Sequence, residues 1–307
     1  MRKKRHLRYV FAARRAYRQG LRISAARYRC ISSILSTVPW PVRKRLDGQE
    51  LEIHLVCYWR DYLLAVWALK TFYRFANVEY PLTVHFDGFV TRRMVRVFKR
   101  HFPGVTLVSQ EEAERVVSPL LESRGLHNLL SQRTRNVFVR KMVDCYLLAQ
   151  SPKVLIIDSD VLFFKRPAHL LDTALVEQDA LFMRDCSYCY TAPLPVIERL
   201  VGRPIVANLN AGVGLIRREA LDLQKIENCL QHAELTGGDP TFLEQTLYAV
   251  GLCASRVSYL PSHYVLSMEQ STDFQRTVAR HYAGDSRALM TSEGMAHLIR
   301  QGFLTAA

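Results

Sequence analysis

Short apolar runs rich in β-branched residues alternate along the chain with longer segments whose apolar residues recur at helical spacing. In the first half, the runs predict strands over 52–58, 82–86, 105–108 and 153–157. The helical pattern predicts helices over 62–75, 92–101, 111–121 and 137–148, and Asp61 can cap the first of them. Strands that alternate with helices indicate βαβ units around a parallel sheet. We therefore expect an α/β fold.

The second half of the chain has a more mixed pattern. Its apolar runs predict strands over 180–183, 212–216, 254–259 and 278–282. Helices are predicted over 219–232 and 241–250, and the second is opened by Asp239 as N-cap with Pro240 at the first helical position. The sequence contains no internal repeat and no low-complexity linker.

Charge divides the chain into two unequal parts. The first 46 residues hold 14 of the 42 Lys and Arg and no Asp or Glu, whereas the remainder carries 28 basic and 28 acidic residues and is neutral. We therefore expect a basic leader over 1–46 and a single domain over 47–307. A nucleic-acid-binding enzyme usually carries a basic face on its body, so the neutral body disfavours nucleic acid as a partner.

The leader allows more than one interpretation. Apolar residues lie among its arginines, which suits a segment on an anionic membrane surface, and a solvated basic arm suits the composition equally well. An organellar presequence has the same Arg-rich, acid-poor composition. No secretory apolar core follows the bases, and no stretch reaches the roughly 18 apolar residues of a membrane span. We expect a cytoplasmic protein, which the membrane interpretation would place peripherally on the cytoplasmic face of a membrane.

The seven cysteines are odd in number and mostly lie in apolar contexts. This usage is typical of reduced intracellular thiols rather than of a disulfide framework. Cys186 and Cys189 form one C-x-x-C without a second pair, and a structural zinc ion needs about four ligands. The sequence therefore does not predict a zinc site there.

Two aspartates, Asp158 and Asp160, directly follow the predicted strand over 153–157. Their i, i+2 spacing puts both side chains on one side of an extended backbone, at the sheet edge where α/β proteins bind ligands. Two carboxylates held this close repel each other unless a cation lies beside them, and a divalent cation also grips a diphosphate. A D-x-D by itself recurs by chance as ordinary turn residues. The apolar runs on both sides of this one favour a metal site.

The doublet also resembles the D-x-D signature of GT-A fold glycosyltransferases, in particular family 8 and its relatives, which are retaining enzymes that use nucleotide sugars. Three further segments are similar to the family's motifs and occur in the same order. They are the N-A-G segment at Asn210-Ala211-Gly212, the acidic-Gln pair at Glu244-Gln245, and the H-x-x-G-x-x-K motif at His281 to Arg287, where Arg287 replaces the lysine. The resemblance covers residues 52–287 and implies an α/β GT-A type catalytic domain with a mostly parallel Rossmann-like sheet flanked by helices.

The resemblance implies a role for each matching residue. Asp158, Asp160 and His281 would hold the metal ion, and the imidazole ligand fits Mn²⁺ better than Mg²⁺. Glu244 or Gln245 would lie near the reacting sugar carbon, as nucleophile or as stabiliser of positive charge. Because neighbours on a helix point about 100° apart, only one of them need face the sugar.

The remaining matches would bind the nucleotide sugar. Asn210 would hydrogen-bond the sugar, with Ala211 and Gly212 letting the chain pass close to it. Gly284 lets backbone approach the phosphates and Arg287 can donate a bidentate fork to them. Arg140 and Lys141 resemble the family's basic residue that reaches the donor, although a solvated helix face explains them nearly as well. Asp87 could contact the ribose or simply be a turn residue.

These features predict a metal-dependent hexosyltransferase that uses a nucleotide sugar, with UDP as the expected nucleotide, and that retains anomeric configuration. The nucleotide-binding half would span about 47–167, and the half over 168–307 would bind a saccharide or glycolipid acceptor. One alternative is a haloacid dehalogenase-like phosphohydrolase, but that family has Thr two residues after the second Asp, where this chain has Leu162. Another is a GT-A-like membrane-surface binding protein without catalysis.

Overall fold

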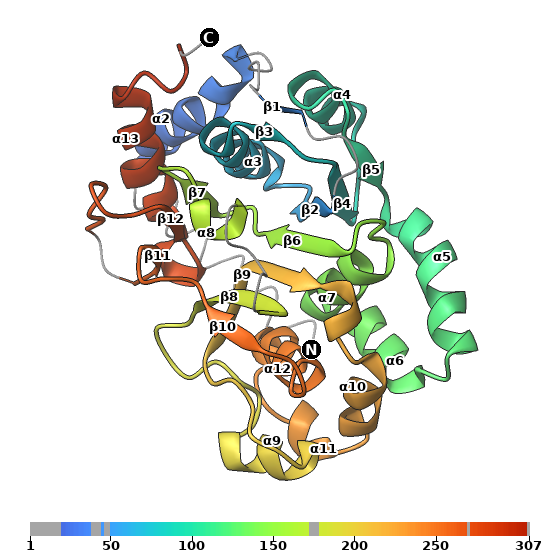
Figure 1. The fold of residues 1–307 in the computed structure, drawn as a ribbon. Helices are drawn as coiled ribbons and strands as arrows, with labels where there is room; N and C mark the ends of the chain where they lie inside the picture. Colours follow the sequence, from blue (N-terminus) through green and yellow to red (C-terminus); the bar gives the residue numbers. More distant parts are fainter. Residues whose placement is uncertain (1–19, 38–43, 46–49, 172–177, 269–270, 306–307) are drawn as a thin grey trace.

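A sheet of seven strands crosses the middle of the protein in the computed structural model, which describes residues 20–37, 44–45, 50–171, 178–268 and 271–305 (Figure 1). The strand order is β10-β8-β9-β6-β2-β4-β5. The bounds of these strands are β2 Leu51–Tyr58, β4 Leu82–Asp87, β5 Thr106–Val108, β6 Lys153–Ile157, β8 Ala180–Arg184, β9 Leu209–Arg217 and β10 Val257–Tyr259. Only β9 runs antiparallel to its neighbours, β6 and β8. The predicted mostly parallel α/β architecture is confirmed.

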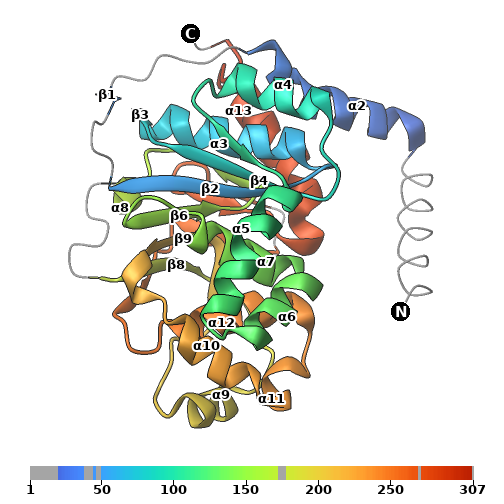
Figure 2. The same ribbon diagram turned by 90° about the vertical axis from the view of Figure 1, so that its right-hand side faces the viewer.

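Helices cover both faces of this sheet (Figure 2). On one face lie α3 Tyr62–Ala76, α4 Arg92–His101, α13 Ala296–Arg300 and the leader helix α2 Gly20–Ser32. On the other face lie α5 Gln110–Ser123, α6 His127–Arg135, α7 Val137–Leu147, α10 Leu223–Leu230 and α12 Leu243–Gly251. The short helices are α8 Ala168–Leu171, α9 Leu194–Val201 and α11 Ala233–Thr236.

The alternation of side chains along β6 explains why both faces are covered. Leu155 and Ile157 pack into one apolar cluster with α3 and α4, whereas Val154 and Ile156 pack into a second cluster with α7 and α12. Successive residues of a strand point to opposite faces, so an uninterrupted apolar strand needs a partner layer on each side.

A smaller sheet of three strands, in the order β11-β12-β7, lies beside the main one. Its strands are β7 Val161–Phe163, β11 Tyr264–Leu266 and β12 Ala279–His281, and the two-residue strands β1 Lys44–Arg45 and β3 Val78–Glu79 form a third sheet. β12 pairs antiparallel with β7, so that His281 lies opposite Val161. This pairing carries a C-terminal strand to the end of β6.

Most of the predicted elements occur in the structure, and some differ in their bounds; the strand predicted over 212–216, for example, already begins at Leu209. The helix predicted over 219–232 is broken, because Leu221 and Asp222 are extended and Asp222 starts α10 by accepting a hydrogen bond from Lys225 N at 2.8 Å. The strand predicted over 254–259 begins only at Val257. Several elements were not predicted, among them the helices α6, α9 and α13 and the strands β7 and β11.

The end of the predicted leader packs against the domain. Ile34 is fully buried, and Trp67 of α3 donates a hydrogen bond from Nε1 to the Ile31 carbonyl at 2.9 Å. The leader before residue 20 lies outside the described residues. In the described ranges, no helix has the length and apolar character that crossing a membrane requires.

Candidate active site

The acidic doublet and His281 meet at the carboxyl end of β6. His281 Nε2 lies 3.2 Å from Asp160 Oδ1 and 3.7 Å from Asp158 Oδ2. One ligand atom from each of the three residues lies within 4.8 Å of the others. Tyr282 N donates to the Asp160 carbonyl at 2.9 Å, which fixes the C-terminal segment against the turn that carries the doublet. The structure therefore brings the three predicted metal ligands together.

The surroundings of His281 suit a metal ligand. Its Nδ1 lies 2.9 Å from Asn210 Oδ1, which also accepts a hydrogen bond from Gly212 N at 3.0 Å. An amide oxygen can only accept, so Nδ1 carries a proton and donates, and Nε2 is the nitrogen that faces the two carboxylates and could bind a metal ion between them. A second partner that fixes the tautomer in this way is typical of metal-bound histidine. Two carboxylate oxygens and an imidazole nitrogen fit a divalent cation such as Mn²⁺.

Electrostatics favour the ionised form of Asp160. Burial acts to raise the pKa of Asp160, but the neighbouring His281 outweighs it and lowers that pKa below its usual range. Burial acts to lower the pKa of His281, and Asp160 outweighs it and raises that pKa. Asp160 is thus a carboxylate that favours a neighbouring positive charge, and the imidazole of His281 lies at that position.

Lys141 of α7 joins the doublet to a second buried acid. Its Nζ donates to Asp158 Oδ1 at 2.7 Å and lies 3.0 Å from Glu244 Oε1. Lys141 is 6% exposed, so the interpretation of a solvated helix face is wrong for this residue. Burial acts to lower its pKa, but the ion pairs with Asp158 and Glu244 raise it, and the side chain is therefore charged.

Glu244 and Gln245 diverge from α12, as expected of neighbours on a helix. Glu244 is buried beside Lys141, and burial raises its pKa although Lys141 opposes this. Gln245 points the other way: its Nε2 donates to the Cys189 carbonyl at 3.1 Å and its Oε1 lies 3.5 Å from Asn210 Nδ2. Gln245 thus contacts Asn210, whereas Glu244 contacts Lys141.

Asn210 stands at the amino end of β9, which lies at the same sheet edge because β9 is antiparallel. Its Nδ2 donates to Asp185 Oδ2 at 2.8 Å. Asp185 follows β8 as Asp158 follows β6, yet the sequence analysis did not single it out. A lone acid after a predicted strand was its only signal.

Arg287 lies on the other side of the doublet. Its guanidinium contacts Asp160 Oδ2 at 3.3 Å and Asp61 Oδ2 at 3.1 Å, and donates to Ser159 Oγ at 3.2 Å. Asp61 occupies the N-cap position of α3 as predicted, but its side chain forms no cap hydrogen bond and binds Arg287 instead. Gly284 has a φ of +53°, which a residue with a side chain rarely adopts.

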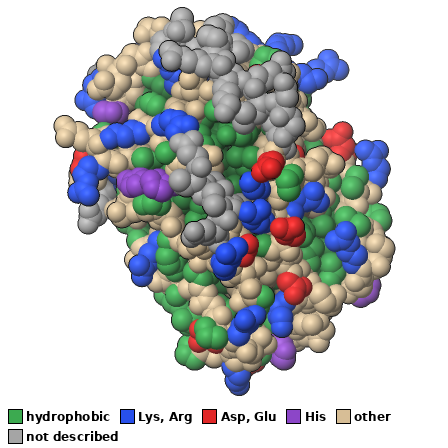
Figure 3. All heavy atoms as spheres, viewed as in Figure 1, with side chains coloured by type: hydrophobic (Ala, Val, Ile, Leu, Met, Phe, Trp, Pro, Cys, Tyr) green, Lys and Arg blue, Asp and Glu red, His purple; other side chains and the backbone are tan. Residues whose placement is uncertain are grey.

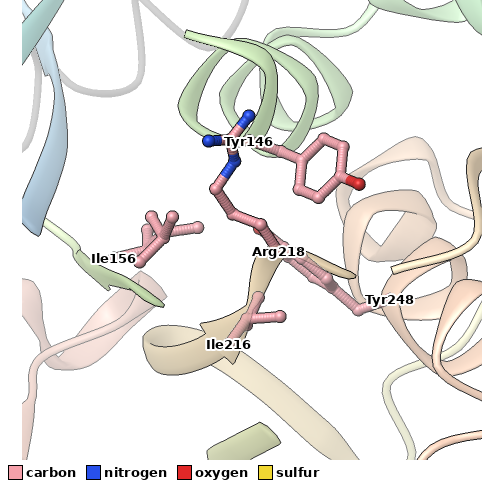
Figure 4. Close-up of a pocket in the computed structure, with 6 residues that line it drawn as sticks. Tyr146, Ile156, Ile216, Arg218 and Tyr248 are labelled. Carbon is pink, nitrogen blue, oxygen red and sulfur yellow. The ribbon is translucent and has the colours of Figure 1, made fainter. Parts of the chain in front are cut away.

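Asp87 and Arg140 form one wall of a cavity between β4 and α7. Arg140 Nη1 donates to Asp87 Oδ1 at 2.8 Å, and His85 and Lys141 line the same cavity. A second, mainly apolar cavity lies between β6, β9, α7 and α12 and shares no lining residue with the first (Figure 4). It is lined by Tyr146, Val154, Ile156, Ile216, Arg218 and Tyr248.

The free thiols of Cys186 and Cys189 are, respectively, exposed and buried.

Comparison with known proteins shows the fold. The sequence matches no family model and no curated protein. Two solved structures of the galactosyltransferase LgtC, one with donor and acceptor sugar analogues and one of an active-site mutant, match with TM-scores of 0.52 and 0.51. Each is 17% identical, and each match covers 83% of this chain and 97% of LgtC. The fold is that of the GT-A glycosyltransferases. The GT-A resemblance inferred from the four motifs is thereby confirmed at the level of fold.

Proposed function

We propose that this chain is a glycosyltransferase that transfers a hexose from a nucleotide sugar, UDP-linked in our proposal, to a saccharide or glycolipid acceptor in the presence of a divalent cation. The single observation that carries the proposal is the convergence of Asp158, Asp160 and His281 beside Asn210 and Gln245, on a GT-A fold. Neither the phosphohydrolase nor the binding-protein alternative accounts for the two side-chain amides, Asn210 and Gln245, that lie beside the acidic trio.

In this proposal, Asp158, Asp160 and His281 hold Mn²⁺ or Mg²⁺, which supplies positive charge to the diphosphate of the donor. Arg287 and the backbone at Gly284 bind phosphate oxygens on the same side. Arg287 would have to share its charge between Asp160 and the phosphates, because it contacts the carboxylate already. Asp87 and Arg140 then lie on the nucleoside side.

Asn210 and Gln245 would bind the sugar, with Asp185 orienting the amide of Asn210. We assign Gln245 rather than Glu244 to the face of the sugar, because the Glu244 carboxylate is buried against Lys141. Lys141 in turn holds Asp158 in place through its hydrogen bond of 2.7 Å. Retention of configuration follows the family resemblance and belongs to the proposal.

The acceptor side of the proposal includes the membrane. A leader with 14 basic and no acidic residues suits an anionic membrane surface, on the cytoplasmic side, where a glycolipid acceptor would be found. The activity itself is tested first without lipid.

The test measures thermal unfolding with Mn²⁺ and a panel of nucleotide sugars, followed by release of the nucleotide. We expect UDP-sugar with Mn²⁺ to raise the unfolding temperature, and Asp158→Asn or Asp160→Asn to abolish that increase. The matched control is Asp179→Asn, a carboxylate that pairs with Arg256 at 3.6 Å and lies at the opposite edge of the sheet. Equal stabilisation of all variants, or no stabilisation of the wild type by any nucleotide sugar, would refute the proposal.

A further inference from the structure

The helix α4 presents a face of uncompensated positive charge. No Asp or Glu occurs between Asp87 and Glu111, whereas five bases do. The apolar side of the helix, with Met94, Val97 and Phe98, is buried against the domain. The bases are exposed on the other side, and in the described ranges none of them forms an ion pair; they are Arg92, Arg93, Arg96, Lys99 and Arg100. Retaining so many unpaired like charges on one helix suggests an anionic partner.

The leader helix α2 extends this basic face. α2 and α4 both pack on α3 and lie on the same side of the sheet (Figure 2). Burial raises the pKa of Tyr62 at the start of α3, and both Arg93 of α4 and Tyr28 of α2 act on that pKa, so the two helices approach each other there. Arg27 and Arg29 of α2 are exposed like the bases of α4. On the face drawn in Figure 3, Lys and Arg side chains project at the upper right edge, where Figure 1 places α4.

Aromatic side chains stand at the border of this face, on the loops that follow β2 and β4. Trp59 is 38% exposed and Phe89 is 71% exposed. Tyr58 pairs with Asp87 in the parallel ladder, so the two loops start side by side. The guanidinium of Arg60 lies 4.7 Å from the centre of the Trp59 ring. Exposed aromatic rings next to arginines are typical of surfaces that insert into the interfacial region of a lipid bilayer.

These loops also border the candidate active site. Trp59 lies two residues before Asp61, which contacts Arg287, and Phe89 lies two residues after Asp87, which contacts Arg140. The loops extend from the carboxyl edge of the sheet, and α2 projects beyond that same edge (Figure 2). The basic helices, the aromatic loops and the site therefore share one side of the domain.

We propose that α4, α2 and the loops at Trp59 and Phe89 form a docking surface for an anionic lipid membrane, with the active site at its border. The surface belongs to the folded domain and adds to any contribution of the leader before residue 20. The docking surface also bears on the proposed function. If the chain is a glycosyltransferase as proposed, its acceptor would be a lipid-linked saccharide held at the bilayer surface. Each base near an anionic membrane contributes roughly a fivefold gain in partitioning.

The first test uses the full chain and vesicles of phosphatidylglycerol and phosphatidylcholine, without any sugar. The variant is Arg92→Glu/Arg93→Glu/Arg96→Glu, and the control reverses three exposed bases elsewhere, Arg124→Glu/Arg135→Glu/Arg203→Glu, with the same change of net charge. We expect the α4 variant to lose at least about tenfold in sedimentation with vesicles and the control to lose about twofold or less. Equal losses, or no binding of the wild type, would overturn the proposal. Tighter binding to an RNA oligonucleotide than to vesicles would overturn it as well.

The second test locates Trp59 relative to the bilayer. The chain has three tryptophans, so the test is made in a Trp40→Phe background. Lipids brominated near the headgroup should quench the tryptophan fluorescence of that protein and quench it much less once Trp59→Phe is added, because the remaining Trp67 is fully buried. Quenching that is unchanged in Trp59→Phe would contradict insertion of this loop. Stabilisation by nucleotide sugar, measured on the same variants, reports on the proposed function separately: a chain that binds vesicles but no nucleotide sugar would refute that function and leave the docking surface standing.

Discussion

The ring of His281 packs against the backbone of Gly212 so closely that a Cβ at residue 212 would lie 2.2 Å from Nδ1. The glycine of the N-A-G segment therefore makes room for the imidazole, in addition to any role toward a sugar. Strand β9 and strand β12 meet at this point, although the two residues are far apart in the sequence.

Gly212→Ala should displace the imidazole and weaken metal binding. We expect a loss of about tenfold or more in Mn²⁺ affinity, measured by calorimetry, because His281 can no longer face both carboxylates. Gly214→Ala, in the same strand β9, is the matched control, since its Cβ would lie 2.5 Å from the ring of Phe182 in β8. Both variants should lose stability, but only the first should lose the metal. Equal Mn²⁺ affinity in the two variants would show that the ring can move without consequence.

Lys141→Met should destabilise the protein by about 3 kcal/mol, because it removes the cation that contacts both Asp158 and the buried carboxyl group of Glu244. The free energy of unfolding in urea measures this loss. Glu244→Gln should cost less, about 1 kcal/mol, because Lys141 keeps Asp158 as a partner. The double variant should be more stable than the sum of the two losses predicts. Additive losses would mean that the two residues do not interact.

Asp185→Ala should lower the rate of sugar transfer and leave metal binding intact. Asp185 accepts from the Asn210 amide and contacts none of the three metal ligands by hydrogen bond or ion pair. We expect a rise in KM for the donor of about tenfold with Mn²⁺ affinity within about twofold of the wild type, since one charge-assisted hydrogen bond is lost. Asp185→Asn should recover part of the effect. A change in Mn²⁺ affinity as large as the change in KM would place Asp185 in the metal centre instead.

The protein should lose stability in mild acid because buried histidines must be charged there. Burial lowers the pKa of His101 to about 4, and neither ring nitrogen has a hydrogen-bond partner among the residues that the structure describes. The unfolded chain binds this proton below its usual pKa near 6.5, whereas the native state does not, so stability falls between about pH 6.5 and pH 4. The loss from His101 alone amounts to about 3 kcal/mol.

Urea unfolding of the wild type and of His101→Phe across this pH range measures that contribution. The variant should show a shallower fall in the free energy of unfolding by about the same 3 kcal/mol. His85, whose pKa burial also lowers, should account for part of the remaining slope. Identical pH profiles of the two proteins would mean that His101 titrates normally in the native state.

The extent to which the sequence predicts this structure differs between elements. The strand over 153–157 and the helix over 92–101 occur with the predicted bounds, because an uninterrupted β-branched run and a clear helical period each leave little choice. The break at Leu221 was missed, since an extended N-cap inside an apolar helical pattern has no strong local signal.

For the candidate site, the sequence supplied the residues but only part of their arrangement. The motifs identified Asp158, Asp160 and His281 as candidate metal ligands, and the structure places the three side chains together. Which of Arg140 and Lys141 faces the doublet depends on how α7 is rotated about its axis relative to the sheet, and periodicity alone does not set this rotation. Asp61 and Asp185 act through contacts with residues distant in the sequence, so no local pattern could identify them.

The antiparallel pairing of β7 with β12 has a consequence for the growing polypeptide. During synthesis the acidic doublet leaves the ribosome more than a hundred residues before the imidazole that completes its trio. Until β12 docks, a nascent chain holds two carboxylates and no nitrogen donor beside them. If the trio binds a cation as proposed, this affinity is acquired last, as a property of the finished tertiary structure, and bound ion would in turn stabilise that structure by mass action.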